Sequence, residues 1–236
     1  MSIYSFPGLE ISFSVALPPL SVVIVAGGRP PEAAWLKKTA AGRVVWAVDS
    51  GVDTCLDAMI EPGRLIGDCD SARPDSWKAV EARGIPVDLY PREKDLTDLQ
   101  IALKSLGMEG TRGALVTGCW GGRFDHLFSN VFSLLGARAW GADVRCVGDE
   151  KELLLLVRGG ESIEVAWVRP PIAISLLALG ERCRGVSITG VRWPLERATL
   201  TRDLPYAISN EPCGERVQLS LEAGELAVYL GWSEET

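Results

Sequence analysis

Short apolar runs that alternate with helix-like stretches between Ser21 and about Gly148 constrain the fold of this 236-residue chain more than any other feature. Strands that are buried on both faces have continuous apolar runs, and helices between them form right-handed crossovers. The alternation therefore predicts a doubly wound, mostly parallel α/β sheet. The predicted strands are residues 22–26, 44–48, 65–67, 86–89, 114–117 and 144–147. The predicted helices are residues 31–41, 52–59, 74–83, 97–106 and 125–139.

Beyond Gly148 the pattern changes to short strand-like segments with Gly, Pro and Asn between them, which is typical of an antiparallel β-sandwich. We therefore expect two domains, an α/β domain over residues 1–148 and a β-sandwich domain over residues 149–236. The predicted strands of the second domain are residues 153–157, 162–165, 172–179, 186–189, 199–201, 207–209, 216–221 and 225–230.

Residues 1–20 form an N-terminal extension, which we assign to the α/β domain. Residues 11–15 alternate apolar and polar side chains, as an edge strand does, and Pro18 and Pro19 end the pattern. We expect the extension to lengthen a sheet edge or to cover part of a dimer surface.

Charge and composition narrow the class of protein. The net charge of −7 argues against a nucleic-acid-binding protein, which needs a basic face. No segment has the ~20 consecutive apolar residues that span a bilayer, so we expect no membrane association. The six cysteines are widely spaced, which predicts reduced thiols in a cytoplasmic protein. The single histidine, His126, excludes a metal site built from several histidines of one chain.

Acids or glycines follow nearly every predicted strand of the α/β domain, where ligands bind in sheets of this type. The segments are Gly27–Arg29, Asp49–Gly51, Gly67–Ser71, Lys94–Asp98 and Gly118–His126. If the sheet is wound as predicted, these segments meet at one edge.

Three of these acids form a candidate Mg²⁺ site. Asp68 and Asp70 are two residues apart, so their side chains face the same way in an extended turn. Asp98 lies in the first turn of the next predicted helix. Hard oxygen ligands without His or Cys select Mg²⁺, and Mg²⁺ held by a few carboxylates usually also binds substrate phosphates. The pattern therefore predicts phosphoryl or pyrophosphoryl transfer.

Glycines and cations beside these acids point to phosphate binding. Gly121 and Gly122 precede a helix start, where backbone N–H groups approach phosphate closely. Arg123 has a guanidinium that bonds phosphate oxygens in pairs, and Lys94 supplies a second positive charge. Structural alternatives remain for other residues: Asp70 and Thr97 are good helix caps, and Arg123 and Asp125 can form an exposed ion pair of little energetic value.

The strings DSG at 49–51, GDCDS at 67–71, KDLTD at 94–98 and GGRFDH at 121–126 resemble, in order and spacing, the signature segments of thiamine pyrophosphokinases. GVRWPL at 190–195 and ISNE at 208–211 resemble motifs of that family's second domain. The resemblance implies a Mg²⁺-dependent transferase that makes thiamine diphosphate and AMP from thiamine and ATP. It also implies a homodimer with active sites at the subunit interface. In the middle of GDCDS, Cys69 stands where an aromatic residue is common in the family.

The resemblance also implies roles for individual residues. Those at the Mg²⁺ would be Asp68, Asp70 and Asp98. Those at ATP would be Asp49, Ser50, Lys94, Thr97, Gly121, Gly122 and Arg123. The catalytic set would be Asp70, Asp98, Arg123 and Asp125. Those at thiamine would be Ser209 and Asn210 from the partner subunit, with Trp193 or Trp232 stacked on its rings. The general base stays open among Asp125, Asp68 and Asp70.

Two other functions are compatible with parts of the pattern. A pyrophosphokinase that acts on a pterin alcohol would share the α/β motifs. A non-catalytic sensor of thiamine or nucleotide would share the scaffold, but we would expect it to have lost its metal carboxylates, which are all present here.

Overall fold

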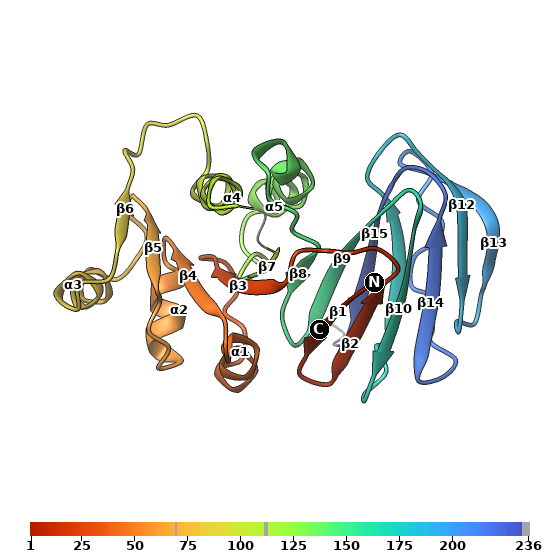
Figure 1. Cartoon of the computed structure of the whole chain (residues 1–236), viewed down its shortest axis with the longest axis horizontal. Coiled ribbons are helices and arrows are strands. Elements are labelled where there is room, and N and C mark those ends of the chain that lie inside the picture. Colours follow the sequence, from red (N-terminus) through yellow and green to blue (C-terminus); the bar gives the residue numbers. More distant parts are fainter. Residues whose placement is uncertain (69, 111–112, 233–236) are drawn as a thin grey trace. The chain divides into compact units, whose positions relative to one another are not determined.

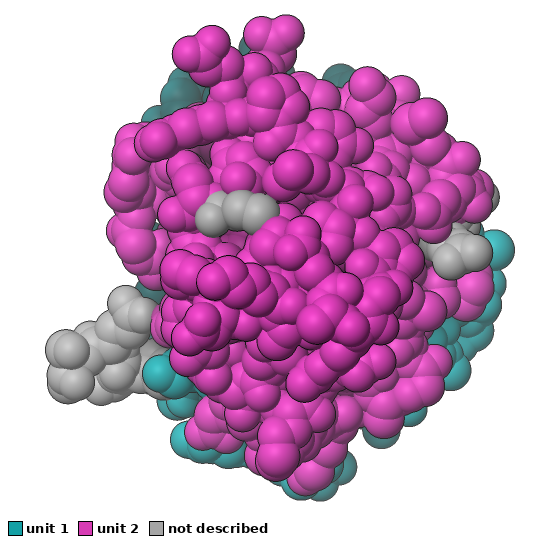
Figure 2. Space-filling model, turned by 90° about the vertical axis from the view of Figure 1, so that its left-hand side faces the viewer, with its two compact units in different colours: residues 1–17, 150–236 teal, residues 18–149 magenta. Residues whose placement is uncertain are grey.

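A computed structural model describes residues 1–68, 70–110 and 113–232 of the chain. The chain divides into two compact units, coloured separately in Figure 2. Pro18–Asp149 forms one, called here the α/β unit. Met1–Leu17 and Glu150–Thr236 together form the other, called here the β unit.

The α/β unit is built on parallel strands in the order β8-β7-β3-β4-β5-β6 (Figure 1). The strands are β3 (Leu20–Val25), β4 (Val44–Val48), β5 (Arg64–Gly67), β6 (Val87–Leu89), β7 (Gly113–Thr117) and β8 (Cys146–Gly148). The chain runs outward from β3 to β6 and then returns to place β7 on the other side of β3. The strand order therefore reverses between β3 and β7, which is where such sheets bind ligands. The predicted doubly wound sheet is confirmed.

The helices of this unit are α1 (Ala33–Ala40), α2 (Gly51–Asp57), α3 (Pro74–Ala82), α4 (Asp98–Met108) and α5 (Phe124–Gly136), followed by the 3₁₀ turn η1 (Ala137–Trp140). Helix α4 begins at Asp98 because Thr97 and Gln100 form a capping box. The Thr97 hydroxyl accepts from the backbone N–H of Gln100 at 3.3 Å, and the Gln100 side chain accepts from the N–H of Thr97 at 3.0 Å. The cap fixes Asp98 in the first helical turn.

Asp70 does not cap the next helix, contrary to one of the alternatives considered from sequence. Helix α3 instead begins at Pro74, with Arg73 at the N-cap position and no side-chain cap. Proline is favoured in the first turn because the N–H that it lacks would have no helical partner there.

The β unit contains two antiparallel layers. One has the strand order β1-β2-β10-β14-β12-β13, and the other comprises β11, β15 and β9. The bounds are β1 (Ser2–Phe6), β2 (Leu9–Phe13), β9 (Glu152–Arg158), β10 (Glu161–Trp167), β11 (Ala173–Ala178), β12 (Arg182–Thr189), β13 (Leu195–Thr201), β14 (Arg216–Leu221) and β15 (Glu225–Gly231). Alternate residues of β10 and β14 are buried, and the two layers touch through β9 with β10 and β15 with β12. The predicted antiparallel sandwich is confirmed.

The N-terminal extension belongs to the β unit, so its assignment to the first domain was wrong. Strand β2 pairs with β10, with Phe13 opposite Ile163, and β1 forms the sheet edge outside it. The cause is the alternation itself: Ile11 and Phe13 are fully buried, and the Tyr4 ring meets the Phe13 ring edge-on at 5.4 Å. An alternating strand shows that it has an apolar face but not which distant sheet covers that face.

The strand predicted at residues 207–209 is absent. Ser209 has a left-handed φ of 56°, and only the next residue, Asn210, forms an isolated bridge to Ile174. A left-handed residue interrupts a β ladder because it turns the chain out of the extended conformation.

No helix in the described part of the chain is long and apolar enough to cross a membrane. The cysteines of the described part are free thiols, with Cys55, Cys119, Cys146 and Cys183 buried and Cys213 exposed.

The N-terminal hairpin is expected to contribute to the stability of the β unit. Phe13→Ala should lower the free energy of unfolding by about 3–5 kcal/mol, because it leaves a cavity in the sandwich core. Ile3→Ala on the edge strand, where the side chain is 55% exposed, should change it little. Urea denaturation measures both; equal stability of the two variants would show that the hairpin is not part of the core.

Candidate functional site

A cavity of about 410 Å³ opens in the α/β unit at the carboxyl ends of β3, β4 and β7. This is the place where the strand order reverses. It gathers residues from all five of the segments that the sequence placed at strand ends. Its lining comprises Ala26, Gly27, Gly28, Val48, Asp49, Ser50, Asp70, Ser71, Thr97, Asp98, Leu99, Gly118, Cys119, Gly121, Gly122, Arg123, His126 and Asn130.

The wall of this cavity requires glycine. The N–H of Gly28 donates to the carbonyl of Gly118 at 2.6 Å, and the N–H of Arg29 donates to the carbonyl of Trp120 at 2.6 Å. A Cβ atom on Gly28 would lie 2.6 Å from both of these carbonyl oxygens, which is closer than real Cβ contacts. Two loops can approach this closely only without a side chain, and the same property lets a backbone approach a phosphate.

Two carboxylates from different elements bind one lysine beside the cavity, and a third carboxylate interacts with both of them. Asp68 follows β5, and Asp98 begins α4. The Lys94 Nζ lies 2.9 Å from Asp68 Oδ2 and 3.1 Å from Asp98 Oδ2, and all three side chains are 11–13% exposed. Asp49, after β4, is the third acid, and its charge interacts with those of Asp68 and Asp98. We call Asp49, Asp68, Asp98 and Lys94 the acid cluster.

The acid cluster has unmet hydrogen-bonding capacity. Within the described part of the chain, the Oδ1 atoms of Asp49 and Asp98 are inaccessible to solvent and have no hydrogen-bond partner. Buried carboxylate oxygens without partners are energetically costly. They are also hard donors of the type that Mg²⁺ prefers, so the residues present fit such an ion.

The charges of the cluster shift one another. The pKa of Asp49 is raised to about 7, first by burial and then by the charges of Asp98 and Asp68. The pKa of Asp68 is lowered, chiefly by its hydrogen bond from Lys94. Burial lowers the pKa of Lys94, but its bonds to Asp68 and Asp98 outweigh burial and raise it. The lysine thus stabilises the charge of Asp68, whereas burial and the neighbouring acids disfavour the charge of Asp49.

Of the three predicted metal ligands Asp68, Asp70 and Asp98, the structure brings only the carboxylates of Asp68 and Asp98 together. Among the described residues, no three His, Cys, Asp or Glu side chains are arranged to hold a metal ion. Asp70 donates its backbone N–H to Asp68 Oδ1 at 3.2 Å, while its own carboxylate lies 3.3 Å from Arg92 Nε and is 44% exposed. Asp68 and Asp98 meet through Lys94, and Asp70 stands on the cavity wall.

Arg123 and Asp125 form an exposed ion pair at the start of α5. Arg123 Nη2 lies 2.5 Å from Asp125 Oδ2, with side chains 75% and 60% exposed. Their hydrogen bond raises the pKa of Arg123 and lowers that of Asp125. Arg123 lines the cavity next to Gly121 and Gly122, which both have positive φ. Asp125 is not part of the lining.

The predicted thiamine contacts lie in the β unit, where two of them bind each other. The Asn210 side chain donates to the Trp193 carbonyl at 2.7 Å and accepts from the Trp193 N–H at 3.1 Å. The Arg192 guanidinium lies 4.8 Å from the centre of the Trp193 ring, which is 53% exposed as a residue. Asn210 thus holds the Trp193 segment in place, and one face of that indole carries a cation.

The other two predicted thiamine contacts are placed differently. The backbone N–H of Ser209 donates to the Ser175 hydroxyl at 3.0 Å. Trp232 follows β15, on the opposite side of β11 from Asn210, and its indole N–H donates to the Arg169 carbonyl at 3.0 Å. Among the described residues, no hydrogen bond or ring contact links Trp232 to Trp193.

Sequence reasoning missed two features of the site. Asn130 lines the cavity and donates to the Cys119 carbonyl at 3.3 Å. It lies four residues after His126 on α5, so the helical period was a usable signal. Arg29 pairs with Asp149 at 2.7 Å, and the Asp149 side chain is fully buried. No local sequence pattern connects these two positions, which are 120 residues apart.

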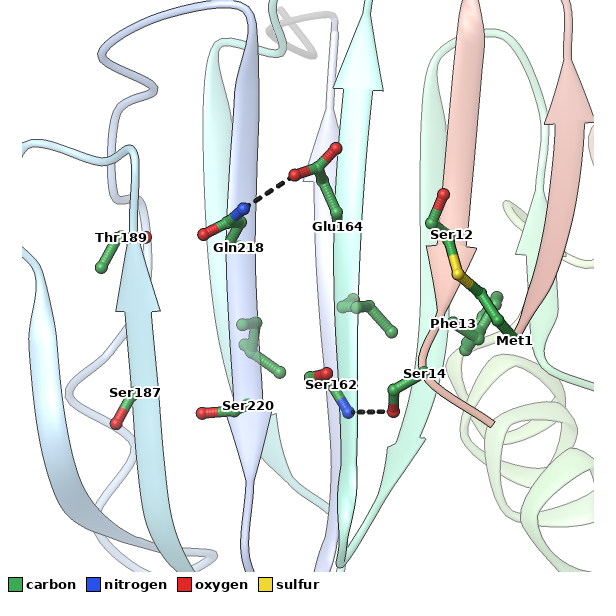
Figure 3. Close-up of a pocket in the computed structure, with 12 residues that line it drawn as sticks. Met1, Ser12, Phe13, Ser14, Ser162, Glu164, Ser187, Thr189, Gln218 and Ser220 are labelled. Carbon is green, nitrogen blue, oxygen red and sulfur yellow. Dashed lines mark hydrogen bonds between the residues drawn. The ribbon is translucent and has the colours of Figure 1, made fainter. Parts of the chain in front are cut away.

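A second cavity, of about 490 Å³, lies on the outer face of the six-stranded sheet of the β unit. Figure 3 shows Ser and Thr side chains standing along neighbouring strands there. Its one acid, Glu164, already accepts from Gln218 at 2.8 Å and pairs with Arg216 at 3.2 Å. Because its lining holds a single acid, we assign the chemistry to the cavity of the α/β unit.

Known proteins resemble both units. The family model described as the thiamin pyrophosphokinase catalytic domain matches residues 36–146, and the model of the thiamin pyrophosphokinase vitamin B1 binding domain matches residues 170–226. A thiamine pyrophosphokinase of Bacillus subtilis is 28% identical over 207 residues, which cover 87% of this chain and 96% of the relative.

Solved structures agree. A crystal structure of thiamine pyrophosphokinase from Bacillus subtilis has a TM-score of 0.80 at 25% identity, covering 91% of this chain and all of that one. One from Geobacillus thermodenitrificans has a TM-score of 0.76 at 27% identity, covering 92% and 99%.

The fold, the site and both matched domains define a two-domain transferase of the pyrophosphokinase class. Within that class, the chain belongs to the thiamine pyrophosphokinase family. The resemblance drawn from the sequence is confirmed, and neither the pterin-alcohol alternative nor the sensor is favoured.

The raised pKa of Asp49 makes stability depend on pH. Asp usually titrates near 4, so the folded state binds a proton that the unfolded state has lost between about pH 4 and pH 7. Stability therefore falls as the pH rises through this range. Asp49→Asn removes the titrating group, and Asn tolerates the left-handed φ of 49° at this position.

We expect the Asp49→Asn variant, in EDTA, to be more stable than the natural protein by about 1–2 kcal/mol at pH 8, allowing for solvent screening. At pH 5 the difference should shrink to about a third of this value, because the unfolded chain begins to lose the proton near pH 4. Asp75→Asn, at an exposed position of α3, is the matched control. Chemical denaturation at the two pH values measures this; a stability gain that is the same at both would contradict the shifted pKa.

Proposed function

We propose that the cavity of the α/β unit binds ATP with Mg²⁺ and that the enzyme transfers pyrophosphate to the thiamine hydroxyl. The products are thiamine diphosphate and AMP. The observation that carries this proposal is the acid cluster with orphaned carboxylate oxygens beside a glycine-walled cavity. Family membership supplies the reaction class.

Asp68, Asp98 and Asp70 would hold the Mg²⁺, with Asp49 nearby on the cavity wall. When bound, the ion neutralises charge on the phosphate oxygens. The backbone N–H groups around Gly121 and Gly122 then approach the phosphates, and Arg123 and Lys94 add positive charge at the transferred group. Ser50 and Thr97 line the same cavity and offer hydroxyl groups to ATP.

In the transfer step, the thiamine hydroxyl oxygen attacks the β-phosphorus of ATP. The bond from that phosphorus to the oxygen bridging the α- and β-phosphates breaks, and AMP leaves with the electron pair. The hydroxyl proton passes to a carboxylate. Of the candidates Asp68, Asp70 and Asp125, only Asp70 lines the cavity, which favours it as the base.

We propose that thiamine is bound by the β unit of a second subunit, so that a homodimer forms the active sites. Trp193 offers an exposed ring to the thiazolium cation. Ser209 and Asn210 lie along one edge of β11, and Trp232 follows β15 at its other edge. On α5, next to Arg123, Phe124 and Phe128 are 75% and 54% exposed, which a partner subunit would cover.

The free thiols of the described cysteines fit a reducing compartment, and we propose a cytoplasmic location.

Incubation with ATP, Mg²⁺ and thiamine should give AMP and thiamine diphosphate one-to-one, and EDTA should abolish both. Asp70→Asn should lower kcat by about 10²-fold, the effect of removing one preorganised group. Asp75→Asn should leave kcat unchanged. Chromatography of the products and steady-state kinetics measure these effects.

ADP with thiamine monophosphate would mean attack at the wrong phosphorus and refute the proposal. AMP release with a pterin alcohol but not with thiamine would refute the substrate. Normal turnover by the Asp70→Asn variant would refute the role of Asp70.

A further inference from the structure

Lys94 occupies the position in the acid cluster that a cation between Asp68 and Asp98 would take. Its Nζ lies 2.9 and 3.1 Å from one oxygen of each carboxylate. Both carboxylates are largely buried, so they cannot rely on water for compensation. The ammonium is therefore the counter-charge that allows Asp68 and Asp98 to lie side by side.

The lysine compensates the cluster only in part. Its one positive charge pairs with Asp68 and Asp98, while Asp49 interacts with these two acids and has no shown contact with the lysine. The Oδ1 atoms of Asp49 and Asp98 have no hydrogen-bond partner within the described chain. A divalent ion would bring twice the charge and would bind oxygens that Lys94 does not reach. It would also repel the ammonium at this distance, so the two cations exclude each other.

The acids are fixed and the lysine is not. Asp49 and Asp68 follow strands of the sheet, and Asp98 is held by the capping box of α4. Lys94 lies in the segment between β6 and α4, which has no helix or strand, and its ammonium ends a flexible four-carbon chain. Lys94 can therefore leave while the carboxylates stay, provided that an anion receives it.

We propose that Lys94 is an internal counter-ion of the metal site, which gives up its place between Asp68 and Asp98 when metal and nucleotide bind together. The released ammonium pairs with the phosphates. Free metal alone must compete with the tethered lysine and binds weakly, whereas the metal–nucleotide complex brings its own anion for Lys94. This inference rests on the metal site of the proposed function.

The test uses Mn²⁺ as the probe, with free Mn²⁺ read by electron paramagnetic resonance. Without nucleotide, Lys94→Met should bind Mn²⁺ about tenfold more tightly than the natural protein. With a non-hydrolysable ATP analogue, the same variant should bind the Mn²⁺ complex about tenfold more weakly, because its phosphates lose a cation. Lys104→Met, at an exposed position of α4, makes the same change in net charge and should affect neither affinity.

These opposite effects separate counter-ion exchange from a general effect of charge. An unchanged Mn²⁺ affinity in Lys94→Met, or equal changes in Lys104→Met, would overturn the proposal. Failure of the proposed function is distinguishable: Asp98→Asn would then bind the Mn²⁺–nucleotide complex as tightly as the natural protein.

If Lys94→Met does not fold in EDTA, thermal unfolding keeps the test decisive. The proposal requires that Mn²⁺ alone restores its folding transition, while it barely shifts that of the natural protein. Lys94→Gln, which keeps a hydrogen-bond donor, gives a second variant for the same comparison. No response of either variant to Mn²⁺ would overturn the proposal.

Discussion

The structure of the site depends on compensation of like charges at the edge of a parallel sheet. Winding the chain outward from β3 and back to β7 brings the ends of several strands to one place. Asp49 and Asp68 reach that place from strand ends, and Asp98 from a helix start. They remain together because Lys94 lies between two of them. The pKa of Asp49 is raised first by burial and then by the charges of Asp98 and Asp68.

The same topology explains why glycines occur in the loops after β3 and β7. The loops after β3 and β7 bond to each other through Gly28 and Gly118, at a separation that excludes side chains. These loops line a cavity that Asp49, Asp70 and Asp98 also line. A cavity lined by closely packed backbone and by carboxylates suits a polyphosphate that arrives with its metal ion. The backbone N–H groups bind the anionic phosphates, and the carboxylates bind the metal cation.

Much of this arrangement was predictable from the sequence, for identifiable reasons. The apolar runs of the parallel strands predicted the sheet. The location of Asp49 and Asp68 followed from their positions directly after strands, and that of Asp98 from its position at a helix start. The cap at Thr97 was recognisable because a Gln follows three residues later. What sequence did not show depends on long-range pairing: Phe13 packs in a sandwich whose β10 begins at Glu161, and Arg29 meets Asp149. The bond between Lys94 and the acids was also hidden, because spacing does not say where a flexible side chain ends.

The central claim is that Asp68 and Asp98 form a cation-binding position, in which the metal ion that accompanies the nucleotide replaces the Lys94 ammonium. Anomalous diffraction from crystals grown with Mn²⁺ and a non-hydrolysable ATP analogue tests it most directly. The account predicts a manganese peak between the Asp68 and Asp98 carboxylates, with the Lys94 ammonium moved to a phosphate oxygen. A nucleotide-bound structure with the manganese elsewhere, and Lys94 still bonded to both carboxylates, would contradict it.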